Sequence, residues 1–275
     1  MSLKIGLIAG SGDFPLEVIK SIRKQKRDVF VIGIKGSASK EIEHFPHYWI
    51  RMGQIGKAIK ALKKNNCKDL IIIGGVKKPN VWLLCPDLGA MKLFFRLILL
   101  TNKGDASILK TLIYFLEKDN NFNILGAEDY IGHLLMSKGL IAGESLSDED
   151  KRDIEIAVNN CYQIGLKDVG QACVVVNEQV ISSEDAFGTD KMLKEIISKN
   201  ITFNNKGVLV KIAKPFQDRR VDLPAIGIRT LELINKIGLS GIALEANSAL
   251  ISEKDKVIEY ANKNKLFIYG LKENG

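Results

Sequence analysis

Short apolar runs alternate with amphipathic segments along this chain, and that alternation restricts its fold more than any other feature. In the first half, residues 4–9, 29–34 and 70–73 have the length and composition of buried strands. Segments with helical periodicity separate these runs, beginning after Pro15 and near Gly56. A βαβ rhythm of this kind is typical of a parallel sheet with helices on its faces.

The second half repeats the alternation after a polar stretch near 138–150, in which Ser147 has the features of a helix N-cap. A helix is expected at 152–164, and strands are expected at 172–176, 208–212, 242–245 and 266–269. We therefore predict an α/β protein of two α/β domains. The first, at 1–138, has a Rossmann-like parallel sheet; the second, at 148–275, is a C-terminal α/β domain. Because glycine turns and cations occur in both halves, we expect a ligand cleft between the domains.

The chain of 275 residues contains 40 Lys and Arg against 32 Asp and Glu, which gives a formal charge of +8. This excess favours an anionic partner, such as a polyphosphate, an acidic membrane surface or a nucleic acid. The four cysteines form no Cys-x-x-Cys pair and lie in or beside apolar runs, at Cys67, Cys85, Cys161 and Cys173. Such scattered, apolar placement indicates reduced core thiols in the cytosol.

Membrane insertion is not expected from the apolar segments. The N-terminus enters a short strand-like run directly, so we expect no export signal. The longest other apolar run, at 93–100, is interrupted by Arg96 and is shorter than the ~20 residues of a spanning helix. With its flanking cations, the segment 91–103 could lie on a membrane surface or contact an acyl chain. A buried core helix is the alternative.

The stretch 207–227 joins an apolar strand to a strongly charged loop. The end of the strand and the loop together contain four cations and two carboxylates, namely Lys211, Lys214, Arg219, Arg220, Asp218 and Asp222. The cations could hold a polyanion, and the carboxylates could hold a metal or take a proton. A solvated basic loop is the alternative. Pro215 and Pro224 favour a site, because they stiffen a segment that a solvated loop could leave mobile.

Gly10, Ser11 and Gly12 follow the first predicted strand and precede the first helix, where backbone N–H groups and the helix dipole bind phosphate. The turn only half matches a dinucleotide fingerprint. Pro15 occupies the third glycine position, and the second strand ends at Lys35 without an acidic residue. We expect a phosphate or nucleotide contact here, with a purely structural turn as the alternative, and a Rossmann-type oxidoreductase is disfavoured.

Other candidate ligands follow predicted strands or begin predicted helices. Lys77 comes after a Gly-Gly turn at the end of a strand, where open α/β sheets bind ligands. Gly188 and Thr189 begin a helix, so their N–H groups could hold an anion, whereas Asp190 could hold a metal or only favour the first helical turn. Glu245, at the end of another strand, is a candidate magnesium or ribose contact. The three histidines do not have the spacing of zinc ligands.

Five segments resemble the UDP-2,3-diacylglucosamine pyrophosphatases of the LpxI type: GLIAGSGDFP at 6–15, KGD at 103–105, DVGQ at 168–171, GTDKML at 188–193 and KPFQDRRVDLPAIG at 214–227. The last motif is the most specific, and the segments span nearly the whole chain. The resemblance implies two α/β domains that hold the substrate between them. It also implies a magnesium-dependent hydrolase of lipid A biosynthesis, which splits UDP-2,3-diacylglucosamine into UMP and 2,3-diacylglucosamine 1-phosphate (lipid X).

By its position in the last motif, Asp222 matches the aspartate that family members need for hydrolysis, and it is our candidate catalytic and metal-binding residue. Asp190 is the second candidate metal ligand. The candidate substrate-binding residues are Gly10, Ser11, Gly12, Lys77, Gln171, Gly188, Thr189, Lys211, Gln217 and Arg220. Where the family usually has Glu before Gly-Thr-Asp, this chain has Phe187, so Glu184 or Asp185 could take the role of that carboxylate.

The sequence therefore predicts a cytoplasmic enzyme, peripheral at the inner membrane, that binds UDP-2,3-diacylglucosamine and Mg²⁺ but no nucleic acid. A homo-oligomer is compatible with this prediction. A diphosphate ester repels an incoming water, so its hydrolysis calls for Mg²⁺, cations and a carboxylate. A non-catalytic nucleotide-sugar or anionic-lipid binding protein is the alternative, because binding needs the cations but not Asp222. Acyl chains need apolar surface, for which 82–84 and 93–100 are candidates.

Overall fold

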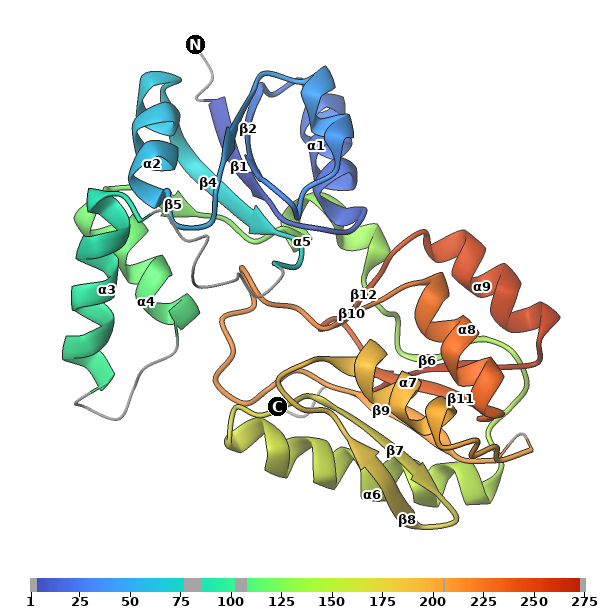
Figure 1. Cartoon of the computed structure of the whole chain (residues 1–275). Coiled ribbons are helices and arrows are strands. Elements are labelled where there is room, and N and C mark those ends of the chain that lie inside the picture. Colours follow the sequence, from blue (N-terminus) through green and yellow to red (C-terminus); the bar gives the residue numbers. More distant parts are fainter. Residues whose placement is uncertain (1–3, 77–85, 102–107, 205, 273–275) are drawn as a thin grey trace. The chain divides into compact units, whose positions relative to one another are not determined.

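The computed structural model describes residues 4–76, 86–101, 108–204 and 206–272. Lys77 and the segments 82–84 and 103–105 lie outside the described residues, as do the side chains at 96–101. The chain forms two compact α/β units, 1–132 with 220–222, and 133–219 with 223–275. This confirms the predicted pair of α/β domains (Figure 1). Among the described helices, none combines the length and the apolar character that crossing a membrane requires.

The N-terminal unit is built on a five-stranded parallel sheet in the order β3-β2-β1-β4-β5. The strands are β1 (Lys4–Ala9), β2 (Val29–Ile34), β3 (His47–Ile50), β4 (Cys67–Ile73) and β5 (Asn123–Ile124). The parallel sheet predicted for this half is thus confirmed. In doubly wound sheets of this order, the strand sequence reverses between β1 and β4, and ligands bind beyond the carboxyl ends of the strands at that point.

Helices cover both faces of this sheet, and Figure 1 shows α1 on one side and α2 on the other. The described helices are α1 (Phe14–Lys24), η1 (Lys40–His44), α2 (Ile55–Lys64), α3 (Leu88–Thr101), α4 (Ile108–Tyr114), the π-helix η3 (Phe115–Asp119), α5 (Glu128–Ile131) and, in the other unit's first residues, η4 (Gly132–Leu134). Pro15 fits the first turn of α1, because that turn needs no intrahelical N–H there. Leu62 of α2 and Leu70 of β4 are fully buried against Gly6, where a Cβ atom would lie 2.5 Å from both side chains.

The C-terminal unit has a six-stranded mixed sheet in the order β6-β13-β11-β9-β7-β8 and a two-stranded parallel sheet of β10 and β12. The large sheet consists of β6 (Gly139–Ala142), β7 (Ala172–Val176), β8 (Gln179–Ser183), β9 (Val208–Lys211), β11 (Gly241–Glu245) and β13 (Phe267–Leu271). The small one consists of β10 (Ala225–Ile226) and β12 (Leu250–Ile251). The four predicted strands correspond to β7, β9, β11 and β13. The antiparallel edge strands β6 and β8 were not predicted.

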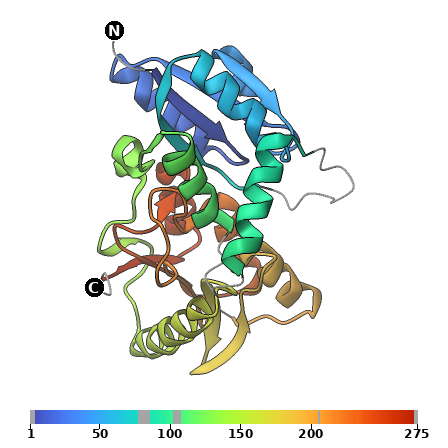
Figure 2. The ribbon, with the colours of Figure 1, turned by 90° about the vertical axis from the view of Figure 1, so that its left-hand side faces the viewer.

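One long helix covers one face of this mixed sheet, and three shorter helices cover the other. They are α6 (Asp148–Leu166), α7 (Thr189–Ser198), α8 (Ile228–Ile237) and α9 (Lys254–Lys263). α6 packs on β7, β8 and β9, and Figure 2 shows this yellow-green helix against the yellow hairpin β7–β8. The predicted helix start is confirmed by a capping box, in which the Ser147 hydroxyl accepts the Asp150 N–H at 3.1 Å and the Asp150 carboxylate accepts the Ser147 N–H at 2.9 Å.

Candidate active site

The turns that follow β1 and β4 are joined by an isolated antiparallel bridge between Ser11 and Gly75. The N–H and the hydroxyl of Ser11 both donate to the Gly75 carbonyl, at 2.6 and 3.0 Å. A Cβ atom at Gly10 would lie 2.4 Å from the carbonyl oxygens of Gly74 and Gly75, so glycine is required for this approach. Gly12 has φ +91° and faces open space. Two donors of Ser11 are therefore used within the protein, and a phosphate contact by this turn stays a prediction.

Residues 220–222 of the charged motif group with the N-terminal unit. The Arg220 guanidinium forms an ion pair with Glu117 of η3 at 2.7 Å and donates to the carbonyl of Ile124, the last residue of β5, at 3.4 Å. Val221 packs against the apolar core of this unit. Asp222 therefore follows two anchored residues at the carboxyl edge of the parallel sheet, the edge at which such sheets bind ligands.

The first part of the same motif is a compact turn in the C-terminal unit. The Gln217 side-chain carbonyl accepts the Lys214 N–H at 2.8 Å, and the Gln217 N–H donates to the Lys214 carbonyl at 3.2 Å. Lys214 also forms an ion pair with Asp168 at 2.8 Å. Phe216, between them, has φ +64° and is 83% exposed. Gln217 thus has a structural role in the turn, in addition to its predicted contact with substrate.

A buried polar network lies at the end of β9. Lys211 is only 8% exposed, and its ammonium donates to the Thr189 hydroxyl oxygen at 3.0 Å and to the Ala225 carbonyl at 3.1 Å. The Thr189 hydroxyl donates to Glu184 Oε1 at 3.1 Å, and Glu184 Oε2 accepts the Gln171 N–H at 3.0 Å. Burial of charged groups is tolerated when they are paired and hydrogen-bonded. The network brings together the predicted site residues Lys211, Thr189 and Gln171 at one edge of the sheet.

Glu184 is a functional candidate that the sequence motifs do not single out, and it is one of the two carboxylates that could take the role of the missing Glu at Phe187. The structure separates these two. Glu184 is 8% exposed and belongs to the network, whereas Asp185 accepts the Phe187 N–H at 2.8 Å in a local turn. The Phe187 ring is exposed and packs under the Lys191 ammonium at 3.6 Å. Gly188, with φ +91°, then starts α7.

Two more polar side chains, those of Glu245 and Gln171, lie at the strand ends next to this network. Glu245, at the end of β11 and 9% exposed, accepts the Ala213 N–H at 3.0 Å and so holds the start of the motif loop. The Ile212 N–H donates to the Gln171 backbone carbonyl at 3.1 Å. The side-chain oxygen Oε1 of Gln171 is buried and has no hydrogen-bond partner among the described residues. A buried acceptor of this kind calls for a donor that the described residues do not supply.

The predicted metal ligands belong to different units, Asp222 to the N-terminal one and Asp190 to the C-terminal one. Asp190 pairs with Arg229 at 3.0 Å, and both side chains are substantially exposed. Within the described part of the chain, no three His, Cys, Asp or Glu side chains gather in the manner of a metal centre. Mg²⁺ commonly needs only one or two carboxylates together with substrate phosphates, so this arrangement leaves the magnesium prediction untested.

Two cysteines lie in the core beside the buried network. Cys161 of α6 donates its thiol to the Val210 carbonyl at 3.6 Å and is in contact with Cys173 of β7. The hydrogen bond with Cys173, together with burial, raises the pKa of the Cys161 thiol, which therefore stays protonated. Burial also raises the pKa of Cys67 to about 11. All three described cysteines are buried and unbridged, which confirms the predicted core thiols at these positions.

Comparison with known proteins gives matches along both units. Residues 4–134 match the LpxI N-terminal domain, and residues 137–269 match the LpxI C-terminal domain. The chain is also similar to the UDP-2,3-diacylglucosamine pyrophosphatase LpxI of Caulobacter vibrioides, with 32% identity over 273 residues. This alignment covers 98% of the chain and 97% of that relative. The resemblance carried by the sequence motifs is thus confirmed, and the chain belongs to the LpxI family.

Proposed function

We propose that this protein hydrolyses the pyrophosphate bond of UDP-2,3-diacylglucosamine and releases UMP and 2,3-diacylglucosamine 1-phosphate, a step of lipid A biosynthesis. The observation that carries this proposal is the 32% identity to a pyrophosphatase of that name, which extends over 98% of the chain. Because the alignment spans both domains at this level of identity, it reaches beyond a shared fold, which alone would not indicate an activity.

In this reaction, a water molecule attacks one phosphorus of the anhydride. The bond from that phosphorus to the bridging oxygen breaks, and the second phosphate leaves with the electron pair. We assign Asp222 to the carboxylate that orients this water and accepts its proton, or that holds the metal. The support is its anchored position directly after Arg220, which Glu117 fixes at 2.7 Å, and Val221, which packs in the core. An anchored carboxylate loses little freedom when it engages the reacting group.

Magnesium remains part of the proposal. The donor set fits Mg²⁺, because this ion prefers oxygen ligands and takes one or two carboxylates with the phosphates of a substrate. Asp222 would hold it, and Asp190, which pairs with Arg229, is the other predicted ligand. When bound, the ion supplies charge neutralisation for the diphosphate. The residues of the chain bind and orient the substrate around that charge.

The predicted substrate-binding residues offer different chemical groups to the substrate. Gln171 offers a buried side-chain acceptor without a partner among the described residues, which suits an N–H or O–H of the nucleotide or sugar. Lys211 and Arg220 offer positive charge for phosphate oxygens, and the helix start at Gly188 and Thr189 offers the positive end of its dipole, with the Gly188 N–H already donating to the Asp185 carbonyl at 3.1 Å. Gly10, Ser11, Gly12, Lys77 and Gln217 complete the proposed set. Diphosphate recognition by several fixed donors is the expected basis of substrate affinity.

A peripheral membrane contact is proposed for α3 in the N-terminal unit. Four of its apolar side chains are exposed, with Phe94 at 61%, Phe95 at 62%, Met91 at 45% and Leu88 at 78%. An exposed apolar helix surface of this kind can lie in the headgroup region of a bilayer. Such a contact would give the enzyme access to a substrate whose acyl chains are anchored in lipid. Self-association into a homo-oligomer is also proposed, and sedimentation velocity tests it.

The test of the proposed function is the release of UMP from UDP-2,3-diacylglucosamine by the purified full chain with Mg²⁺, and then with a chelator in excess. We expect release that stops when the metal is removed. Binding of the substrate without any UMP release would favour the alternative, a nucleotide-sugar or anionic-lipid binding protein. A change in nicotinamide fluorescence on mixing would instead revive the oxidoreductase. Release that continues unchanged with the chelator would remove magnesium from the proposal.

A further inference from the structure

The apolar side chains of β13 and β6, at one end of the C-terminal sheet, are only partly covered by α6. α6 packs on β7, β8 and β9, while β13 and the edge strand β6 lie at the other end of the strand order. Tyr269 and Leu140 are register partners, and Leu271 lies two residues further along β13. Because directly paired residues and residues two apart share a face, these three side chains point to the side of the sheet on which α6 lies.

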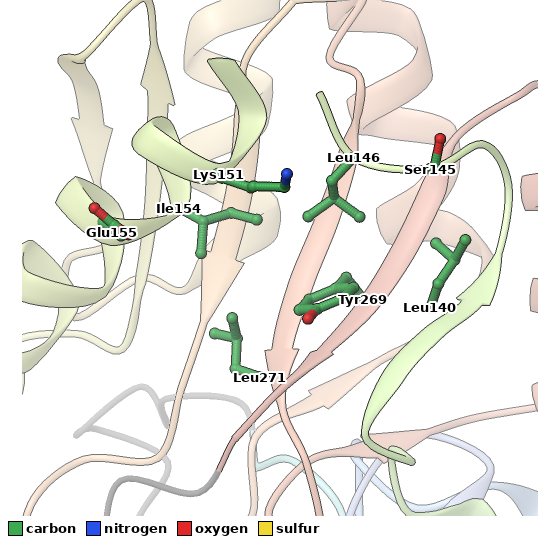
Figure 3. A pocket seen from close by; sticks show the side chains of 8 residues that line it. All are labelled: Leu140, Ser145, Leu146, Lys151, Ile154, Glu155, Tyr269 and Leu271. Carbon is green, nitrogen blue, oxygen red and sulfur yellow. The ribbon is translucent and has the colours of Figure 1, made fainter. Parts of the chain in front are cut away.

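These side chains line a pocket of about 560 Å³. Its lining consists of Leu140, Ser145, Leu146, Lys151, Ile154, Glu155, Tyr269 and Leu271. Figure 3 shows Leu146, Ile154, Tyr269 and Leu271 around a common space, with the Lys151 amine and the Ser145 hydroxyl toward its upper side. Lys151 pairs with Asp148 at 2.8 Å, and the Glu155 carboxylate is the other charged group of the lining. Because most of the remaining lining residues are apolar, the hollow favours a mostly apolar ligand.

The strand that lines this pocket, β13, pairs with β11, whose end lies beside the buried polar network. β13 runs parallel to β11, and Leu271 pairs with Glu245 in register. The Glu245 carboxylate accepts the N–H of Ala213, the residue that opens the charged motif loop. The backbone at the end of the pocket floor and the backbone that holds the motif loop are therefore adjacent strands of one sheet. An apolar group bound here would lie on the same unit as Lys211, Thr189 and Gln171 of the proposed substrate-binding set.

We propose that this pocket binds an acyl chain of the substrate. The inference rests on the proposed function, because a diacylated substrate brings long apolar chains attached close to its phosphate. The volume lies within the roughly 300–1,000 Å³ of small-molecule sites. A concave hollow fits a flexible methylene chain, whereas a second copy of this protein would need to cover a surface of roughly 1,000 Å² with good complementarity. The pocket thereby selects substrates by chain length.

The test uses Leu140→Glu, which places a charge at the pocket, and Val180→Glu as its matched control. Both residues are 44% exposed, and they lie on the two opposite edge strands of the same sheet, β6 and β8. UMP release is measured with long-chain and short-chain UDP-2,3-diacylglucosamine. Each methylene kept out of an apolar site lowers binding about four-fold, so the long-to-short ratio of kcat/KM should fall by about ten-fold or more in Leu140→Glu only. An unchanged ratio, or an equal fall in both variants, overturns the proposal.

A second measurement does not depend on turnover. In Tyr269→Trp, the indole fluorescence should be quenched by 2,3-diacylglucosamine 1-phosphate with brominated acyl chains, relative to the parent protein, and in Val180→Trp it should not. Equal quenching in the two variants, or none, overturns the acyl site. If Leu140→Glu changes the sedimentation of the protein but not its chain-length preference, the surface joins two copies, and the proposal is wrong. If the parent protein releases no UMP, the proposed function fails, and selective quenching still establishes the acyl site.

Discussion

Replacing Thr189 with valine removes one hydroxyl group from the buried network and keeps the size of the side chain. In the native protein, this hydroxyl accepts a hydrogen bond from Lys211 at 3.0 Å and donates one to Glu184 at 3.1 Å. Bonds to charged groups contribute about 1.5–3 kcal/mol each. Lys211 keeps its bond to the Ala225 carbonyl. We expect the free energy of unfolding to fall by about 3–6 kcal/mol, with the lower value if the two charges move into direct contact.

The matched control is Thr230→Val in α8. Thr230 and Thr189 are both 7% exposed, but among the described residues the Thr230 side chain makes no hydrogen bond. Urea unfolding followed by circular dichroism gives the free energy of each variant from its midpoint and slope. Thr230→Val should change it by less than about 1 kcal/mol, since valine retains the buried volume. Equal losses in the two variants, or a loss below about 1 kcal/mol in Thr189→Val, would contradict the assigned strength of the network.

Changing Asp222 to Asn keeps its shape and removes its charge, so kcat for UMP release should fall about 10²-fold or more while substrate still binds. Near-normal turnover would refute the catalytic role of Asp222. The control is Asp218→Glu on the same loop, which should be tolerated. Replacing Phe94 and Phe95 with Ser should weaken sedimentation with anionic vesicles and lower turnover of long-chain more than short-chain substrate; equal losses would indicate core packing. Burial raises the pKa of Asp87, but the N–H groups of neighbouring helix starts lower it more, to below 3.8. Because the pKa of Asp87 is lower in the folded protein than in the unfolded chain, the ionised carboxylate stabilises the fold above pH 4, and this stabilisation is lost as the pH falls below 4. Thermal melts of Asp87→Asn should therefore show a smaller loss of stability between pH 6 and pH 3 than melts of the parent protein.

The strands β1, β2 and β4 could be predicted from the sequence because they are largely buried and appear as continuous apolar runs, such as Leu70 to Ile73. The edge strand β3 was not predicted, because it is short and only Ile50 in it is buried. The edge strands of the C-terminal sheet lack that signal. β8 contains Gln179 and two serines, and β6 contains only four residues, so tertiary pairing rather than local composition makes them strands. Two-residue strands such as β5 have too little sequence to produce a pattern.

Site residues that stand in a sequence motif could be predicted. Site residues whose roles depend on contacts formed by the folded chain could not. Asp222 and Lys211 stand in one charged stretch, 207–227, and Thr189 stands in the motif at 188–193, so all three could be named. The role of Glu184 depends on contacts with residues 5 and 13 positions away in sequence, and the strand that it directly follows, β8, was not predicted. Ser11 was expected to donate to phosphate, but both of its donors bind Gly75, which lies 64 positions further along the chain. No local pattern reports such a pairing.

The grouping of residues 220–222 with the N-terminal unit has a consequence for the order in which the protein matures during synthesis. Ribosomes release the chain from its N-terminus, and domains generally fold as they emerge. The N-terminal unit, however, obtains Arg220 and Val221 only after most of the second unit has been translated. Until then, Glu117 lacks its cation and the core surface under Val221 is uncovered. Nascent chains arrested before this point should therefore be more sensitive to proteases near η3 than chains arrested after it.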